Sequence, residues 1–184
     1  VTIMEGRGSR VGFLAKLDAQ GEFTWVNLLD RDRPTNVFAA AASAIAVGPS
    51  GTIYVAGSYR CGARLGTIPL GDNCVNFTNI NSFAAALTPD GQWLWAKTFG
   101  GSGQDTVTHL GVDAAENLYL TGTTESRDAQ FDSFTVAATG TSSAFLAKLS
   151  SGRSAVVNPE RTLEGDLRFQ VLGTAGLTNR VEFS

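Results

Sequence analysis

Short segments in which hydrophobic and polar residues alternate run through most of this chain. The alternation is clear over residues 11–17, 22–26, 44–47 and 52–57, and similar segments follow further along. A period of two places successive side chains on opposite faces of an extended strand, so each segment predicts a β-strand. No segment keeps the 3.6-residue period of an amphipathic helix, so we expect little helix.

The strand segments are joined in pairs by turn sequences. A first hairpin, residues 11–26, turns at residues 18–21, and its copy, residues 82–97, turns at residues 88–91. The second turn contains Pro-Asp-Gly, in which proline fixes φ for a turn and glycine reaches positive φ. Both pairs therefore predict β-hairpins.

A second type of hairpin is repeated as well, in residues 44–57 and residues 110–122. Tyr54 and Tyr119 occupy matching positions on one face of the two hairpins. The opposite face is aliphatic in both, where Ile45, Val47, Ile53 and Val55 match Leu110, Val112, Leu118 and Leu120. The chain therefore repeats a unit of two hairpins.

Three copies of one phrase mark the repeat, beginning at Phe13, Phe83 and Phe145. We expect units at residues 10–80 and 81–143, with a third beginning at residue 144. Four antiparallel strands form one β-propeller blade, whose two faces pack on neighbouring blades. The pattern predicts an all-β chain of about two complete blades plus partial blades. Because a closed ring needs at least four blades, we expect further blades in a longer chain, closure of a ring by several copies, or an open arc capped by another element.

The sequence also resembles a known family of repeats. Residues 93–105, then 111–113 and 117–122, are similar to the SBBP repeats of bacterial β-propeller proteins, with their rhythm of tryptophan, Gly-Gly, aspartate and Tyr-x-x-Gly. Residues 27–32 depart from this rhythm in the first unit. The resemblance covers roughly residues 9–150, and it implies a β-propeller in a secreted or cell-surface bacterial protein without a common catalytic motif.

After the repeats the composition changes. We expect residues 151–184 to form a linker and a C-terminal β segment, because Asn158-Pro159 is a breaker sequence. Residues 166–172 and 179–183 then alternate around a Gly-rich turn, which predicts a hairpin and looks like the start of a small β-sandwich module. The chain opens with Val1 and ends within a strand pattern, so we expect it to be part of a larger protein.

The charge and composition exclude some partners. The 184 residues carry a net charge of −3 without a basic run, so nothing attracts nucleic acid or an anionic membrane surface. No apolar stretch approaches the roughly 18 residues of a membrane-spanning helix. We therefore expect a partner that is a protein or a surface polysaccharide, or other copies of the chain in a homo-oligomer or polymer.

The two cysteines, Cys61 and Cys74, flank a Gly-rich segment that predicts an irregular loop. A disulfide between them would close this loop and would indicate an oxidising compartment, which agrees with an extracellular or cell-surface location. The alternative is two unrelated thiols.

Several residues are candidates for chemistry, each with a structural alternative. His109 could join Ser102 and Asp105 in a triad, but its matching position in the first unit is Ala44, which favours a structural histidine. Asp105 and Asp113 are candidate calcium ligands, and the alternative is that they cap turn amides. We expect no catalytic residue, no bound cofactor other than this candidate calcium, and no enzyme activity.

Two further features have ordinary interpretations. The Gly-rich residues 100–103 lack the lysine and helix of a phosphate-binding loop. Trp25, Trp93 and Trp95 could stack on sugars, but their matching positions in the repeats favour a place in the core between blades.

The sequence thus favours a non-enzymatic extracellular scaffold for interaction or adhesion. Its loops at residues 31–42 and 59–79 would present the binding face. One alternative is a self-assembling subunit of an extracellular fibre or sheath, because exposed blade edges can add strands. Another is a glycan-binding propeller.

Overall fold

The computed structural model describes residues 11–31, 40–60, 62–71, 79–150, 154–161 and 167–172, and these residues form strands and turns without a helix. The strands are β1 (Gly12–Leu17), β2 (Phe23–Arg31), β3 (Ala40–Val47), β4 (Ile53–Tyr59), β5 (Ala63–Leu65), β6 (Ile68–Pro69), β7 (Asn81–Leu87), β8 (Trp93–Phe99), β9 (Asp105–Val112), β10 (Leu118–Thr124), β11 (Ala129–Phe131), β12 (Phe134–Val136), β13 (Ser143–Leu149), β14 (Ser154–Arg161) and β15 (Leu167–Leu172).

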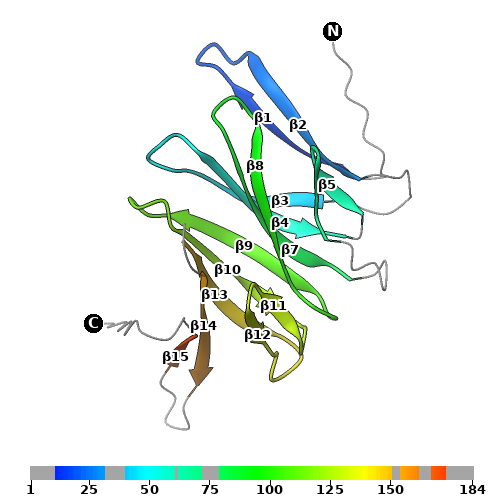
Figure 1. Ribbon diagram of the computed structural model, residues 1–184, viewed down its shortest axis with the longest axis vertical. Helices are drawn as coiled ribbons and strands as arrows, with labels where there is room; N and C mark the ends of the chain where they lie inside the picture. Colours follow the sequence, from blue (N-terminus) through cyan, green and yellow to red (C-terminus); the bar gives the residue numbers. More distant parts are fainter. Residues whose placement is uncertain are drawn as a thin grey trace.

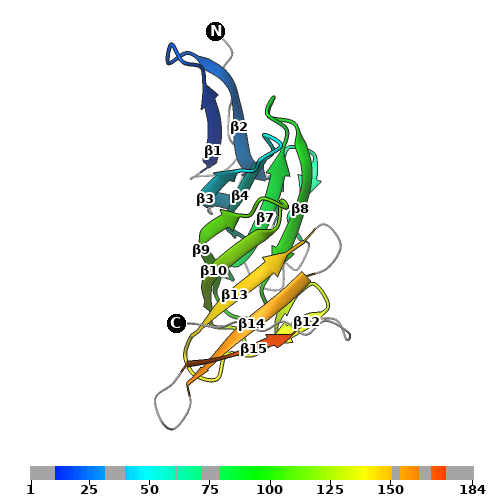
Figure 2. The same ribbon diagram turned by 90° about the vertical axis from the view of Figure 1, so that its left-hand side faces the viewer.

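The strands form three large antiparallel sheets and one two-stranded sheet, β11-β12, which confirms the predicted all-β class. Sheet 1 has the order β1-β2-β5-β6, sheet 2 the order β3-β4-β7-β8, and sheet 3 the order β15-β14-β13-β10-β9. Sheet 2 lies between the other two, as both views show (Figures 1 and 2). The chain therefore advances from one end of a stack to the other.

Sheets 2 and 3 do not coincide with the expected repeat units, whereas sheet 1 takes all its strands from the unit at residues 10–80. Sheet 2 takes β3 and β4 from the unit at residues 10–80, and β7 and β8 from the unit at residues 81–143. The register joins them directly, since Val55 of β4 lies opposite Ala85 of β7. The unit at residues 10–80 therefore contributes four strands to sheet 1 and two to sheet 2, and the unit at residues 81–143 contributes two strands each to sheets 2 and 3.

Two small hairpins link consecutive sheets, and neither was expected from the sequence. The pair β5–β6 follows β4 of sheet 2 in the chain, yet β5 pairs with β2 of sheet 1. The pair β11–β12 follows β10 of sheet 3 and reaches back to sheet 2, where Gly100 and Gln130 exchange two backbone hydrogen bonds of 3.1 and 2.9 Å. The segment after Cys61 thus contains a hairpin in place of the irregular loop expected there.

The strand-to-strand turns share one hydrogen-bonding scheme. Asp18 N donates to Glu22 O at 2.9 Å, and its carboxylate accepts the amides of Gln20 and Glu22. The fourth residue of such a turn needs positive φ, which Gly21 supplies at 84°. In the β9–β10 turn this position is Glu116, at φ 62°.

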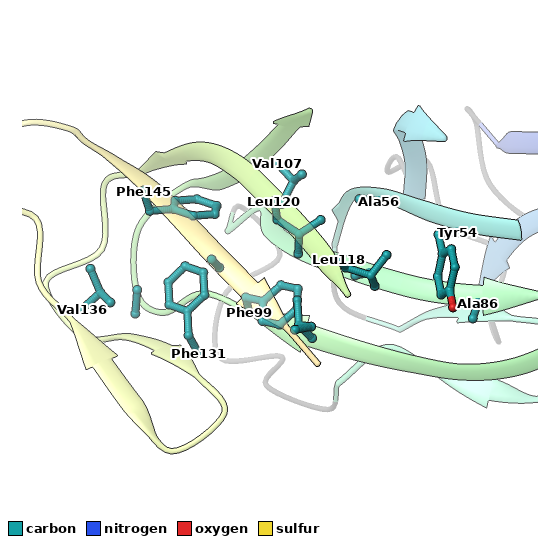
Figure 3. Close-up of a cluster of buried hydrophobic side chains, with 14 residues drawn as sticks. Tyr54, Ala56, Ala86, Phe99, Val107, Leu118, Leu120, Phe131, Val136 and Phe145 are labelled. Carbon is teal, nitrogen blue, oxygen red and sulfur yellow. The ribbon is translucent and has the colours of Figure 1, made fainter. Parts of the chain in front are cut away.

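Two hydrophobic cores fill the spaces between the sheets. The core between sheets 1 and 2 includes Leu29, Leu65 and Phe83, all fully buried. The core between sheets 2 and 3 is rich in aromatic residues, as Figure 3 shows. There the Phe131 ring stacks on Phe99 at a centroid distance of 5.5 Å and meets the edge of Phe145 at 4.8 Å.

Within residues 151–184, where a linker and a C-terminal β segment are expected, residues 154–161 form strand β14. Strand β14 pairs with β13 from Leu146–Val157 to Leu149–Ser154 and so becomes the fourth strand of sheet 3. Pro159 lies beyond this paired stretch, so its missing N–H removes no hydrogen bond to β13. The predicted strand at residues 166–172 is present as β15, which pairs with β14.

Candidate functional site

Three of the six exposed large hydrophobic side chains among the described residues lie on one face of β1 and β2; the others are Ile45 and Val47 on β3 and Leu94 on β8. Phe13 is 65% exposed, Leu17 49% and Phe23 66%. Directly opposite residues of an antiparallel pair share a face, and the pairs here are Phe13–Leu28, Ala15–Val26 and Leu17–Phe23. We call these six residues the front face of sheet 1. An apolar patch of this kind marks an interaction surface more often than scattered hydrophobic residues do.

The same positions are buried in the two other sheets. Phe83, Ala85 and Leu87 match Phe13, Ala15 and Leu17 in the repeated phrase, and they are fully buried in the core that sheet 2 shares with sheet 1. The front face is therefore the surface on which a sheet packs against the sheet before it.

Sheet 3 repeats this arrangement. Phe145, Ala147 and Leu149 are 3%, 3% and 7% exposed in the core shared with sheet 2. Of the three sheets, only sheet 1 has a front face without a neighbouring sheet among the described residues.

The opposite surface of β1 and β2, the back face of sheet 1, holds the β7–β8 turn of sheet 2 through hydrogen bonds. Lys16 Nζ donates to the carbonyl of Pro89 at 2.9 Å, and Trp25 Nε1 donates to the same carbonyl at 3.1 Å. Asn27 Nδ2 donates to the carbonyl of Gly91 at 2.8 Å. A Cβ at Gly91 would lie 2.7 Å from the Trp25 ring, so this contact depends on glycine. Polar contacts at the turns thus fix the register of the two sheets.

An acidic side chain performs the same task between sheets 2 and 3. Glu116 accepts hydrogen bonds from the amide of Ser50 at 2.7 Å and from the hydroxyl of Tyr54 at 2.5 Å. Burial, followed by this carboxylate, raises the pKa of Tyr54 to about 12, and the Tyr54 hydrogen bond lowers the pKa of Glu116. Sequence reasoning missed Glu116, although a glutamate where other turns carry glycine was a visible signal.

Asp105 is a buried connector between sheets 2 and 3. Its carboxylate accepts hydrogen bonds from Gly101 N at 2.8 Å, from Ser126 Oγ at 2.7 Å and from Thr124 Oγ1. Its backbone carbonyl accepts the hydroxyl of Ser82 on β7 at 2.8 Å. The carboxylate oxygens of Asp105 are thus hydrogen-bonded to donors of the protein itself.

The Gly-rich loop before Asp105 is likewise held by the protein's own side chains. The amide of Ser102 donates to Asp128 Oδ1 and the amide of Gly103 donates to Ser126 Oγ, both at 2.8 Å. A Cβ at Gly103 would lie 2.6 Å from the backbone of Glu125. The glycines therefore permit close backbone packing.

Asp113, the other candidate calcium ligand, caps the β9–β10 turn. Its Oδ1 accepts the amides of Ala115 and Asn117 at 2.9 Å, and its Oδ2 accepts Asn117 Nδ2 at 2.7 Å and the Tyr119 hydroxyl at 3.1 Å. These bonds, led by that of the Asn117 side chain, lower the pKa of Asp113 to about 2. Asp105 begins β9 and Asp113 follows its end, so the structure does not bring the two together. Among the described residues there is no group of three His, Cys, Asp or Glu side chains suited to hold a metal ion.

The residues of the candidate triad, His109, Ser102 and Asp105, do not contact one another through their side chains. His109 is exposed, with Nδ1 3.0 Å from the hydroxyl of Thr108, while the Ser102 hydroxyl donates to Asp128. Neither contacts the carboxylate of Asp105. Trp25, Trp93 and Trp95 are half-buried against the inter-sheet cores.

Some expectations fall on residues that the structure does not describe. Cys61 and Cys74, with their expected disulfide, lie outside the described residues. So do most of the loop at residues 31–42 and much of the loop at residues 59–79.

In the part of the chain that the structure describes, there is no helix of the length and hydropathy needed to cross a membrane. Comparison with known proteins gives no family: no family model matches the sequence, and no curated protein matches it.

Proposed function

We propose that this chain is a segment of a bacterial extracellular β-propeller that acts as a non-enzymatic scaffold for interaction or adhesion. Its sheets are then propeller blades. The supporting observation is that two consecutive interfaces use matching positions: Phe83 and Phe145 fill the cores, and turn contacts fix the register. Stacked four-stranded antiparallel sheets that advance in this way are typical of propellers.

The topology places tight turns at one rim of the stack. The β1–β2 turn lies beside the β7–β8 turn through Lys16, and the β3–β4 turn lies beside the β9–β10 turn through Glu116. The longer connections begin at the other ends of the strands, after Arg31, Tyr59 and Thr124. Because long connections vary without disturbing a core, this second rim is suited to present a binding surface to a protein or a surface polysaccharide.

Binding of the full chain to an array of surface polysaccharides and to an immobilised extract of cell-surface proteins tests this function. Charge reversal at Arg127 and Glu125, both exposed on the second rim, should weaken binding. The matched control is Gln20→Lys on the tight-turn rim, which should leave binding unchanged. An array hit that survives the Arg127 and Glu125 changes would place the binding surface elsewhere, and binding to neither probe would contradict the scaffold function.

A second candidate is a self-assembling structural subunit. The observation that favours it is the front face of sheet 1, where Phe13 is about two-thirds exposed although a neighbouring sheet buries the matching Phe83 and Phe145 of sheets 2 and 3.

A further inference from the structure

One five-residue sequence occurs twice, and sheet 2 covers a different face of the strand at each occurrence. Phe-Leu-Ala-Lys-Leu forms residues 13–17 of β1 and residues 145–149 of β13. In sheet 3 the front residue Phe145 is buried at 3% exposure by sheet 2. In sheet 1 the back residue Leu14 is buried at 8% exposure, also by sheet 2. The surfaces left over are the front of sheet 1 and the back of sheet 3.

The back of sheet 3 has the side chains needed for such a contact. Leu146 and Lys148 match Leu14 and Lys16, and both are only half-buried. The Lys148 ammonium lies 5.2 Å from the centroid of the Tyr119 ring on the same face, which holds the side chain over the sheet. Sheets 1 and 3 lie at opposite ends of the stack, so both surfaces point outward (Figures 1 and 2).

We infer that the front face of sheet 1 binds the back face of sheet 3 from a second copy of this chain. The contact repeats the packing already present between sheets 1 and 2. The inference rests on the proposed packing of sheets as successive propeller blades, and it names the partner of the exposed face.

The charges of the two surfaces are complementary. In the contact between sheets 1 and 2, Lys16 reaches the carbonyl of Pro89 in the β7–β8 turn. In the contact between copies, Lys148 meets the matching β1–β2 turn, which carries the carboxylates of Asp18 and Glu22. Because a different surface is used on each copy, the contact is heterologous, and it closes into a ring or continues as a filament.

Light scattering and sedimentation of the full chain across the micromolar range test the inference. We expect an average mass above the 19.3 kDa of one chain, rising with concentration. Phe13→Glu removes the front contact and Leu146→Glu removes the back contact, so each variant alone should have the mass of one chain. Leu94→Glu, at an exposed leucine (52%) of sheet 2 outside both surfaces, is the control and should assemble like the unmodified chain.

Mixing the two variants separates this arrangement from the alternatives. Each variant keeps the surface that the other lacks, so an equimolar mixture should form a pair of two chains and nothing larger. Pairing of front face with front face would instead leave Leu146→Glu fully able to assemble, and this result would overturn the inference.

A one-chain mass of the unmodified protein at every concentration would overturn it too. Circular dichroism confirms that each variant is folded, and Lys148→Glu replaces Leu146→Glu if the latter is not. Binding to the polysaccharide and protein probes is measured separately on Phe13→Glu, so failure of assembly and failure of the scaffold function are distinguishable.

Discussion

Phe13 and Phe83 occupy the same position of the repeated phrase but have opposite surroundings. Phe83 is fully buried between sheets 1 and 2, whereas Phe13 is 65% exposed. Replacing a buried phenylalanine by alanine removes its transfer free energy and leaves a cavity, which together cost about 3–5 kcal/mol. We expect Phe83→Ala to lose about this much, whereas Phe13→Ala should lose at most about 0.5 kcal/mol, the usual range for surface substitutions.

Urea unfolding of dilute protein, followed by tryptophan fluorescence, measures both variants. Thermal unfolding gives a second measurement. For a chain of this size a loss of 1 kcal/mol lowers the melting temperature by roughly 2–4 °C, so Phe83→Ala should melt about 10 °C below the unmodified chain. The slope of the unfolding free energy against urea should stay the same, because neither variant changes the surface exposed on unfolding. Equal losses for the two variants in dilute solution would refute the reasoning that the front face is uncovered in the single chain.

Other substitutions probe the connectors. Asp105→Ala should destabilise the chain by about 2–3 kcal/mol in urea, because the buried hydroxyls of Thr124 and Ser126 and the half-buried amide of Gly101 lose a charged acceptor; a neutral result would show that these donors find other partners. The pKa of Asp113 is lowered to about 2, so its contribution to stability is complete above its unfolded value near pH 4 and is lost as the pH falls towards 2. Asp113→Asn should therefore flatten the acid side of a melting profile against pH, and an unchanged profile would contradict this. Gly103→Ala should lower the melting temperature because its Cβ would lie 2.6 Å from backbone, whereas Gly140→Ala, with nothing within 4 Å, should not; similar effects at both sites would exclude the packing explanation.

Much of this fold could be predicted from local sequence. The alternation around Phe83 and the Pro-Asp-Gly turn are short-range signals, and β7 and β8 formed where they indicated. Matching residues such as Tyr54 and Tyr119 revealed the repeat.

The pairing of hairpins into sheets could not be predicted in the same way. Both faces of these strands are apolar, so the pattern does not show which neighbour covers which face. The pairing of β4 with β7 joins two hairpins that are distant in the sequence, and the hairpins have similar patterns, so the local sequence does not specify which two become neighbours. Strands of three residues, such as β5 and β11, are too short for a periodicity to be recognised.

The candidate site was only partly predictable for a related reason. The sequence showed Asp105 beside a Gly-rich loop, with a cation and a turn cap as its alternatives. Which donors surround the carboxylate depends on β10 and the segment after it, which supply Thr124 and Ser126. The sequence patterns around Phe13 and Phe83 are alike, so only the structure shows that Phe13 is exposed and Phe83 is buried.

The offset between units and sheets has a mechanical consequence. The backbone crosses the interface between sheets 1 and 2 in the middle of a unit, between β2 and β3, and crosses the next interface between β8 and β9. The unit at residues 81–143 therefore cannot detach without opening sheets 2 and 3 together, and a pulling force along the chain loads neighbouring sheets in series through covalent bonds. Each interface between sheets is therefore held by covalent backbone connections as well as by its hydrophobic core.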